Sequence, residues 1–412
     1  MSNRTKLSRR EFIKGITGAA AGACIGGTLE TGKASAGKRK SKILRIDKCP
    51  VHDSKLRHIG LDSMLSLMSG NELKFYRTGK SHPWGGPDGI IEPHDVVLIK
   101  VNSQWKFRGT TNTDVVRGVI HRILEHPDGF SGEVVIFENG QMQGSFDGDP
   151  LAWGRYKKEP ECAGVHVNAE DDTLTVDRLV NEVFAGASVS SFLLDPVCSN
   201  FIANDDHTAS GYRKITDAMI SYPCFTTTGK HRVELREGIW NGKGYDNNLK
   251  LINIPVLKTH PGTGITCALK NSYGILSMKD DDNWRKIRHY EESGSQCGKM
   301  YSLVRMPDLN IIDAVWVTHQ THHRGYPPST THRADILLAG TDPVALDYYG
   351  SKHILLPLGG DRAEEHDPDS FPGLINHLTG AQKFLNKNGG IKGKQSQQGD
   401  DNIKVISRRA ET

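Results

Sequence analysis

The sequence contains no C-x-x-C pair in its 412 residues. A zinc ribbon and a ferredoxin-type cluster both need closely spaced cysteines, so this spacing excludes both kinds of site. Disulfides are permitted if the protein reaches an oxidising compartment, but the sequence does not fix any pairing, and partly buried free thiols fit equally well. Six cysteines follow residue 36: Cys49, Cys162, Cys198, Cys224, Cys267 and Cys297.

Long apolar runs and an excess of one charge are missing as well. The chain has 52 Lys and Arg residues and 48 Asp and Glu residues, but six of the basic and two of the acidic residues lie within residues 1–36. The remainder holds 46 of each sign, so no electrostatic footprint indicates a nucleic-acid partner. After residue 36, no run approaches the roughly 18 to 20 apolar residues of a membrane helix, which predicts a mature chain without a membrane span.

The first 36 residues have the pattern of an export signal. SRREFIK at residues 8–14 is similar to the twin-arginine signal, and ASA at residues 34–36 is the A-x-A pattern that signal peptidase cuts. We expect cleavage after Ala36 and a periplasmic or extracellular protein, with the twin-arginine export machinery as its partner. That pathway moves folded proteins, many of which acquire a cofactor first. The alternatives are a basic N-terminus that stays in the cytoplasm and a lipoprotein acylated at Cys24.

Apolar runs alternate with helical patterns along the chain. Residues 95–102 and 132–139 are typical of buried strands, and residues 113–126 between them are typical of an amphipathic helix. This alternation predicts an α/β fold with a mostly parallel sheet, flanking helices and long polar loop insertions. Further helices are expected near 175–186 and 212–222 and from Asp342, and further strands at 189–195, 249–257, 309–317 and 334–340.

The same patterns predict how the chain is divided. After the signal peptide (1–36), we expect a single α/β domain over residues 37–386, with its core at about 95–350. Two segments, 140–171 and 280–299, look irregular and polar, as functional loops or insertions do. The end of the chain, 387–412, is expected to be a flexible tail.

The stretch VLKTHPGTGITCALKNSYGIL, residues 256–276, places hydrogen-bond donors beside glycines after a predicted strand. In open α/β sheets, ligands bind at the carboxyl ends of strands, and free N–H groups at a helix start bind anions. We expect Thr266 to cap a short helix, with Lys258, His260 and Lys270 around a phosphate, carboxylate or sulfate group. A dinucleotide fingerprint lacks its third glycine here, and a P-loop lacks its G-K-[ST]. The alternative is an ordinary turn with solvated lysines.

A second cluster, THQTHHRG at residues 318–325, is dense in histidine. Neutral imidazoles suit zinc, copper or iron, so His319, His322 and His323 are candidate ligands of a divalent metal. Asp313 on the preceding strand is the most plausible carboxylate ligand. The alternative is an exposed polar loop.

Polar residues also end two neighbouring strands of the predicted sheet. Lys100 and Asn102 end one strand and Glu138 ends the next, so these residues should meet at one edge. Lys100 is expensive to bury without a partner. Asp342, followed by a proline, is a strong helix-start signal, and Asp347 one turn later has no assigned role.

Several of these segments occur in a characteristic order: KVN at 100–102, TDVV at 113–116, VLKTH at 256–260, TCALKNSYG at 266–274, IDA at 312–314 and AGTDPVALD at 339–347. Together they resemble the domain of unknown function 362 family, from about residue 95 to 350. The resemblance implies no established role. Some members have ferredoxin-type cysteine clusters beside this domain, which this chain lacks, and the histidine cluster replaces a glycine-rich segment of many members.

The leading hypothesis is an exported α/β protein that binds an anionic small molecule at the 258–271 loop; whether it is an enzyme is left open. Lysines would neutralise the anion and His260 would act as acid or base. The predicted catalytic residues are His260 and Lys258, and the predicted ligand-binding residues are Lys100, Asn102, Thr266, Lys270 and Asn271. One rival is a metal-dependent enzyme built on the histidine cluster. Another is a non-catalytic accessory protein for an exported redox enzyme.

Overall fold

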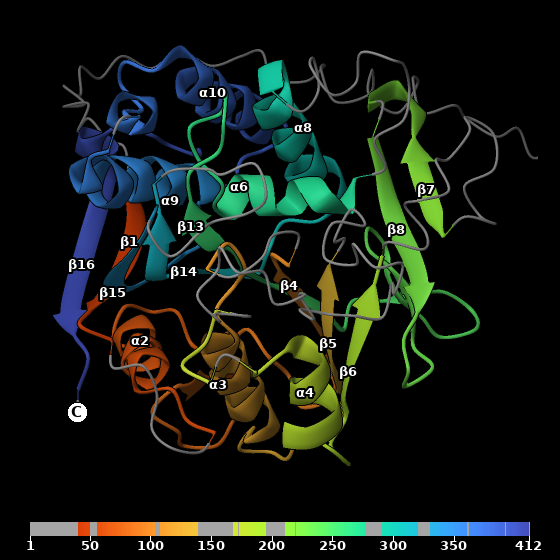
Figure 1. The fold of residues 1–412 in the computed structure, drawn as a ribbon. Coiled ribbons are helices and arrows are strands. Elements are labelled where there is room, and N and C mark those ends of the chain that lie inside the picture. Colours follow the sequence, from red (N-terminus) through yellow and green to blue (C-terminus); the bar gives the residue numbers. More distant parts are fainter. Residues whose placement is uncertain are drawn as a thin grey trace, which may run out of the picture. The chain divides into compact units, whose positions relative to one another are not determined.

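The computed structural model describes residues 40–49, 56–103, 108–138, 168–171, 173–194, 211–218, 220–276, 290–319, 330–360, 362–391 and 393–411. Among these residues, the central feature is a nine-stranded sheet that lies between two groups of helices (Figure 1). The strand order is β16-β1-β15-β14-β12-β4-β5-β6, and β13 pairs with β14. The bounds are β1 Ser41–Asp47, β4 Val96–Val101, β5 Glu133–Glu138, β6 Val189–Leu193, β12 Leu249–Ile254, β13 Val256–Lys258, β14 Leu309–Thr318, β15 Thr331–Gly340 and β16 Ile403–Arg409.

Most neighbouring strands of this sheet run parallel. β12 pairs in parallel with β4 and β14, and β5 pairs in parallel with β4 and β6. β15 is antiparallel to both of its neighbours, β14 and β1, while β16 is parallel to β1. The predicted α/β fold with a mostly parallel sheet is therefore confirmed.

Both faces of the sheet are buried at β4. In β4, Val96 and Leu98 pack into one apolar core, whereas Val97, Ile99 and Val101 pack into a second core. Because successive side chains of a strand point to opposite faces, a strand covered on both sides has a continuous apolar run. The only polar residue of β4 is Lys100, and the alternation places it on the same face as Val96 and Leu98.

The helices lie on the two sides of the sheet (Figure 1). One side has α2 (Ile59–Ser69), α3 (Thr113–Leu124) and α4 (Val176–Arg178, continued by a π-helical turn at Leu179–Val183); the other has α6 (Ala268–Asn271), α8 (Ser293–Lys299), α9 (Pro343–Gly350) and α10 (Pro372–Lys387). The helix start predicted at Asp342 is confirmed, because its side chain accepts hydrogen bonds from the amides of Val344 and Ala345. None of the helices in the described ranges is long and apolar enough to cross a membrane.

The helix predicted at residues 212–222 is wrong. This segment contains β7 (Tyr212–Ile215) and the start of β8 (Ile220–Thr226), which belong to a five-stranded antiparallel sheet of order β11-β10-β9-β8-β7. Tyr222 precedes Pro223, and a residue before proline is disfavoured in the helical region. The other strands of this sheet are β9 Arg232–Glu234, β10 Gly238–Trp240 and β11 Tyr245–Asp246; β2 (Tyr76–Arg77) and β3 (Gly85–Gly86) form a separate pair.

Two further predictions of irregular structure need correction. Within the segment 280–299, Ser293–Lys299 forms helix α8, which packs against α10. Within the segment 387–412, Ile403–Arg409 forms β16, whose seven residues pair with β1 from Ser41 to Asp47. The prediction of a flexible tail is wrong for this strand, because its backbone is hydrogen-bonded into the main sheet.

Candidate functional site

A buried ion pair joins the carboxyl ends of β4 and β5. The Lys100 ammonium nitrogen, Nζ, lies 2.8 Å from Glu138 Oε2, and both side chains are 2 % exposed. Lys100 Nζ also donates to the Val101 carbonyl at 2.7 Å. Burial lowers the pKa of Lys100, while the charge and hydrogen bond of Glu138 act in the opposite direction. The predicted meeting of polar strand ends is thus observed for this pair.

Lys258, at the end of β13, reaches the same buried region. Its Nζ donates to Asn102 Oδ1 at 3.0 Å and to the carbonyl of Gly109. Burial lowers the pKa of Lys258 well below its ordinary value; the negative charge of Glu138 raises it and the positive charge of Lys100 lowers it further. One carboxylate, Glu138, therefore acts on two buried lysines.

Asn271, at the end of α6, completes this arrangement. Its side-chain nitrogen donates to the Lys100 carbonyl at 3.3 Å and to Asn253 Oδ1 at 2.8 Å, and its oxygen lies 3.5 Å from Lys100 Nζ. Asn253 in turn donates to the Ala268 carbonyl at 3.0 Å. The structure thus brings together four of the predicted residues: Lys100, Asn102, Lys258 and Asn271.

The start of α6 is not organised as predicted. Thr266 does not cap the helix: the N-cap residue is Cys267, and it makes no side-chain capping bond. Instead, Asp347 of α9 accepts hydrogen bonds from the amides of Ala268 at 2.7 Å and Leu269 at 3.2 Å. The amides expected to bind a ligand are occupied by a carboxylate of the protein itself.

The glycines of the 259–265 loop lie against other parts of the protein itself. Gly262 and Gly264 have φ angles of 78° and 73°, a region that other residues rarely adopt. A Cβ atom at Gly264 would lie 2.2 Å from the Glu365 carbonyl oxygen, so only glycine fits this contact. His366, which is fully buried, lies with Nδ1 2.9 Å from the Gly264 carbonyl and Nε2 3.3 Å from the His319 carbonyl.

His260 and Thr266 lie at this loop. His260 Nδ1 is 2.9 Å from Thr263 Oγ1, and its ring centroid is 5.8 Å from that of Tyr290. The backbone of Thr266 exchanges two hydrogen bonds with that of Lys258, which closes the base of the loop. The catalytic role of His260 stays a prediction.

Lys270 contacts a different set of residues from its neighbour Asn271. Its Nζ lies 3.4 Å from Ser293 Oγ of α8 and 4.6 Å from the centre of the Tyr273 ring. Burial lowers the pKa of Lys270 to about 8. The pKa of His377 on α10 is lowered by burial and also by the positive charge of Lys270. These contacts place Lys270 towards α8 and α10, whereas Asn271 reaches Lys100.

The candidate metal residues are only partly described. The His319 ring lies 4.6 Å from the His332 ring, centroid to centroid, while His322 and His323 lie outside the described ranges. Asp313 accepts hydrogen bonds from the Asn112 and Val315 amides, at 2.7 and 3.1 Å, and burial raises its pKa to about 7. In the described part of the chain, no three His, Cys, Asp or Glu residues are placed to hold a metal ion. The metal site stays a prediction.

The cysteines of the described segments are free thiols. Cys49, Cys267 and Cys297 are buried, and Cys224 is partly buried. The other two cysteines after residue 36, Cys162 and Cys198, lie outside the described ranges. Free thiols, one of the two possibilities that the sequence left open, are therefore found at four positions, three of them buried.

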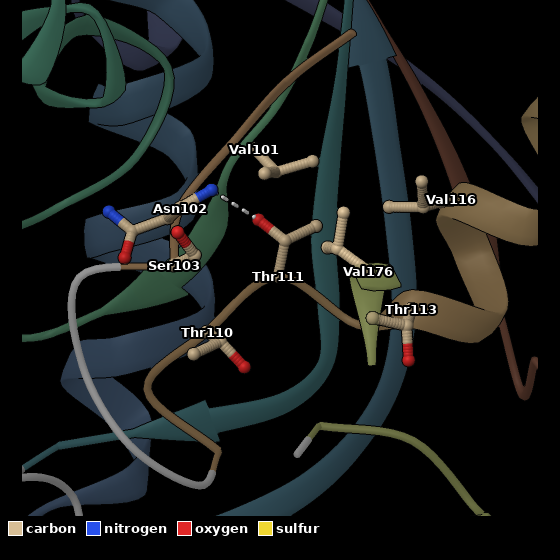
Figure 2. A pocket seen from close by; sticks show the side chains of 8 residues that line it. All are labelled: Val101, Asn102, Ser103, Thr110, Thr111, Thr113, Val116 and Val176. Carbon is tan, nitrogen blue, oxygen red and sulfur yellow. Dashed lines mark hydrogen bonds between the residues drawn. The ribbon is translucent and has the colours of Figure 1, made fainter. Parts of the chain in front are cut away.

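A small cavity lies beside Asn102, the residue that accepts a hydrogen bond from Lys258. It measures about 20 Å³, which is room for about one water molecule. Figure 2 shows that the Asn102 backbone amide donates to Thr111 Oγ1, that Thr110 lies on the segment leading into α3, and that Thr113 lies at the start of this helix. Thr113 Oγ1 is buried without a hydrogen-bond partner in the described structure. The cavity is lined by Val101, Asn102, Ser103, Thr110, Thr111, Thr113, Val116 and Val176.

A comparison with known protein families matches the part of the chain that carries the C-terminal residues of this site. Residues 172–352 match the family described as "Domain of unknown function (DUF362)". This match supports the resemblance to the DUF362 family that the sequence motifs indicated. The comparisons with curated proteins and with solved structures found no match.

The DUF362 match includes Lys258, Asn271 and Asp347, but Lys100 and Glu138 precede it. The ion pair at the carboxyl ends of β4 and β5 thus lies outside the matched range. It joins the matched segment through Asn271, which contacts Lys100.

Sequence reasoning missed three residues near the site. The sequence could have indicated Asn253, because it is a polar residue within the apolar run of β12. The structure buries its side chain, which is 1 % exposed. His377 lies on the buried face of α10 together with Leu374 and Leu378, a spacing that would have indicated its burial. For His366, no sequence signal points to its two contacts with distant carbonyl groups.

Proposed function

We propose that the carboxyl edge of the sheet binds the anionic group of a small molecule. The anion site, as we define it, consists of Lys100, Asn102, Lys258 and Asn271. One observation supports this proposal above the others: two lysines, Lys100 and Lys258, are buried close enough together for the Glu138 carboxylate to act on both. Burial disfavours the charged form of a lysine and a nearby negative charge favours it, so an added anion would favour the protonated form of both lysines.

The position of the anion site supports the same proposal. Ligands of open α/β sheets bind beyond the carboxyl ends of the strands, where β4, β5 and β13 place these side chains. The cavity beside Asn102 has room for about one water molecule, so it can receive one small group of a ligand. The loop glycines and the start of α6 are not part of the proposed site, because the protein's own groups occupy them.

Binding at this site should respond to pH with a definite sign. Burial lowers the pKa of Lys258 and of Lys100, and an anion raises both again. Anion binding would then be accompanied by proton uptake, so affinity should fall as the pH rises. Affinity that is independent of pH would contradict lysine protonation as the source of binding.

Replacing Lys258 by methionine tests the proposal. The change removes the charge and keeps an unbranched side chain, so the affinity for an anion should fall by about tenfold or more. We would measure thermal shifts and titration calorimetry with phosphate, sulfate, acetate and succinate. If no anion in the panel binds the wild type, the proposal is wrong.

Lys250→Met is the matched control. Lys250 is a buried lysine at the start of β12. Its Nζ lies 3.8 Å from Asp95 Oδ2, so this lysine is paired with a carboxylate other than Glu138. It belongs to the opposite end of the same strands, since Leu249 pairs with Val96 and Ile254 with Val101. Anion affinity should be unchanged in Lys250→Met, whereas an equal loss in both variants would indicate a general effect of removing a buried lysine.

We also propose that residues 1–36 direct export by the twin-arginine pathway. Arg9→Lys combined with Arg10→Lys should leave the uncleaved precursor in the cytoplasm, because the pathway selects the arginine pair. Arg4→Lys is the control, since it changes an arginine outside the SRREFIK motif. Cell fractionation, with sequencing of the mature N-terminus, measures the outcome. Export and cleavage of the double variant at wild-type levels would contradict this pathway.

A further inference from the structure

Helix α6 is too short to be stable without help. It has four residues, Ala268–Asn271, continued by a 3-10 turn at Ser272–Ile275, and so short a helix is unfavourable by itself because nucleation fixes several dihedral angles for one hydrogen bond. Its position therefore depends on contacts with the rest of the protein. Those contacts determine where Asn271, its last residue, meets Lys100.

Asp347 provides the contact at the start of this helix. It is fully buried in α9, and its two carboxylate oxygens accept separately from the Ala268 and Leu269 amides. A carboxylate at a helix N-terminus satisfies free N–H groups and interacts favourably with the helix dipole. At the other end, Asn271 contacts Lys100 and Asn253.

We infer that Asp347 is a positioning residue for the anion site: by holding the start of α6, it sets Asn271 against Lys100. This inference rests on the proposed function. It adds a residue that lies 79 positions from Ala268 in the chain. None of the contacts described above joins Asp347 directly to Lys100 or Lys258. The path of contacts runs from Asp347 through the backbone of α6 to Asn271, and from there to Lys100.

The surroundings of Asp347 add a pH dependence. Burial raises the pKa of Asp347 to about 7, while hydrogen bonds from the Cys267 thiol and the two α6 amides oppose the shift, and the charge of Asp342 adds to it. The Nε2 atom of His377, on α10, lies 4.0 Å from Asp347 Oδ2. The ionised carboxylate accepts hydrogen bonds more strongly than the acid does, so α6 should be held more firmly above about pH 7. This effect on anion affinity is opposite in sign to that of the two lysines, so it is measured as the difference between the wild type and Asp347→Asn across the pH range.

Asp347→Asn is the first test. The amide keeps the size of the side chain but offers only one good acceptor, so Asn271 should be less well fixed and anion affinity should fall by about tenfold. The probes are phosphate, sulfate and acetate, titrated between pH 6 and 9. If Asp347 acts through Asn271, combining Asp347→Asn with Asn271→Ala should cost no more affinity than Asn271→Ala alone. Fully additive losses would overturn the inference.

A readout without ligand separates the two proposals. Acetylation of Lys100, followed by mass spectrometry and normalised to Lys250, should be faster in Asp347→Asn than in the wild type. If the wild type binds no anion, the proposed function fails, and the Lys100 acetylation rate still decides whether Asp347 positions this lysine. An unchanged rate in a folded Asp347→Asn variant would overturn the inference.

Asp308→Asn is the control, because Asp308 is a partly buried aspartate that accepts from the Leu251 amide at 2.9 Å and not from α6. Its anion affinity and its Lys100 acetylation rate should equal those of the wild type. If Asp347→Asn does not fold, Asp347→Glu is measured instead. Glutamate keeps the negative charge but has a side chain longer by one methylene group. Wild-type values of anion affinity and of the Lys100 acetylation rate in this variant would count against the inference.

Discussion

Replacing Glu138 by glutamine is expected to lower the free energy of unfolding by about 3–5 kcal/mol, the usual cost of removing one partner of a buried ion pair. Glu138 is the carboxylate 2.8 Å from Lys100, and its charge also raises the pKa of Lys258. Its Oε2 accepts from the Ser103 amide at 3.3 Å as well, a bond that glutamine can keep. The expected loss therefore comes mainly from the missing charge.

Equilibrium unfolding in urea measures this loss, and a second substitution tests its origin. Adding Lys100→Met to Glu138→Gln removes the lysine that has lost its partner, so the double variant should recover part of the lost stability. The control is Glu182→Gln, which removes an exposed partner of Arg178 and should cost less than about 1 kcal/mol. Glu138→Gln with a loss as small as that of the control would show that the pair is not charged in the folded protein.

The same ion pair shows what the sequence made predictable. The runs VVLIKV and EVVIFE identified two buried strands, and parallel neighbours bring their carboxyl ends together. Lys100 and Glu138 could therefore be placed at one edge from local patterns alone. Local patterns could not give the distance between them or the burial of Lys258.

The start of α6 shows where such reasoning ends. Thr266 was a reasonable cap by residue type, but the group that meets the helix amides is Asp347, which is 79 positions away from Ala268. Gly262 and Gly264 likewise suggested space for a ligand, and Gly264 instead meets the backbone at Glu365. In both places a group of the protein itself, distant in sequence, occupies the space that local reasoning assigned to a ligand.

His377→Phe is expected to make the protein more resistant to acid. His377 is 1 % exposed, and neither ring nitrogen has a hydrogen-bond partner in the described structure. Burial lowers the pKa of His377 to about 3, and the charge of Lys270 contributes to this. The unfolded chain has an ordinary histidine pKa of about 6.5, so it binds more protons than the folded protein between pH 6.5 and 3. Stability is therefore present above about pH 6.5 and is lost as the pH falls.

The expected effect is large, because one proton corresponds to about 1.4 kcal/mol per pH unit. Between pH 7 and 4, the wild type should lose about 3 kcal/mol more than His377→Phe in urea unfolding. Asp313 and Asp347, whose pKa burial raises to about 7, act with the opposite sign over this range, but both remain in the variant. Leu374→Met, on the same buried face of α10, should shift the pH curve without changing its slope. Parallel curves for His377→Phe and the wild type would mean that His377 becomes protonated in the folded protein.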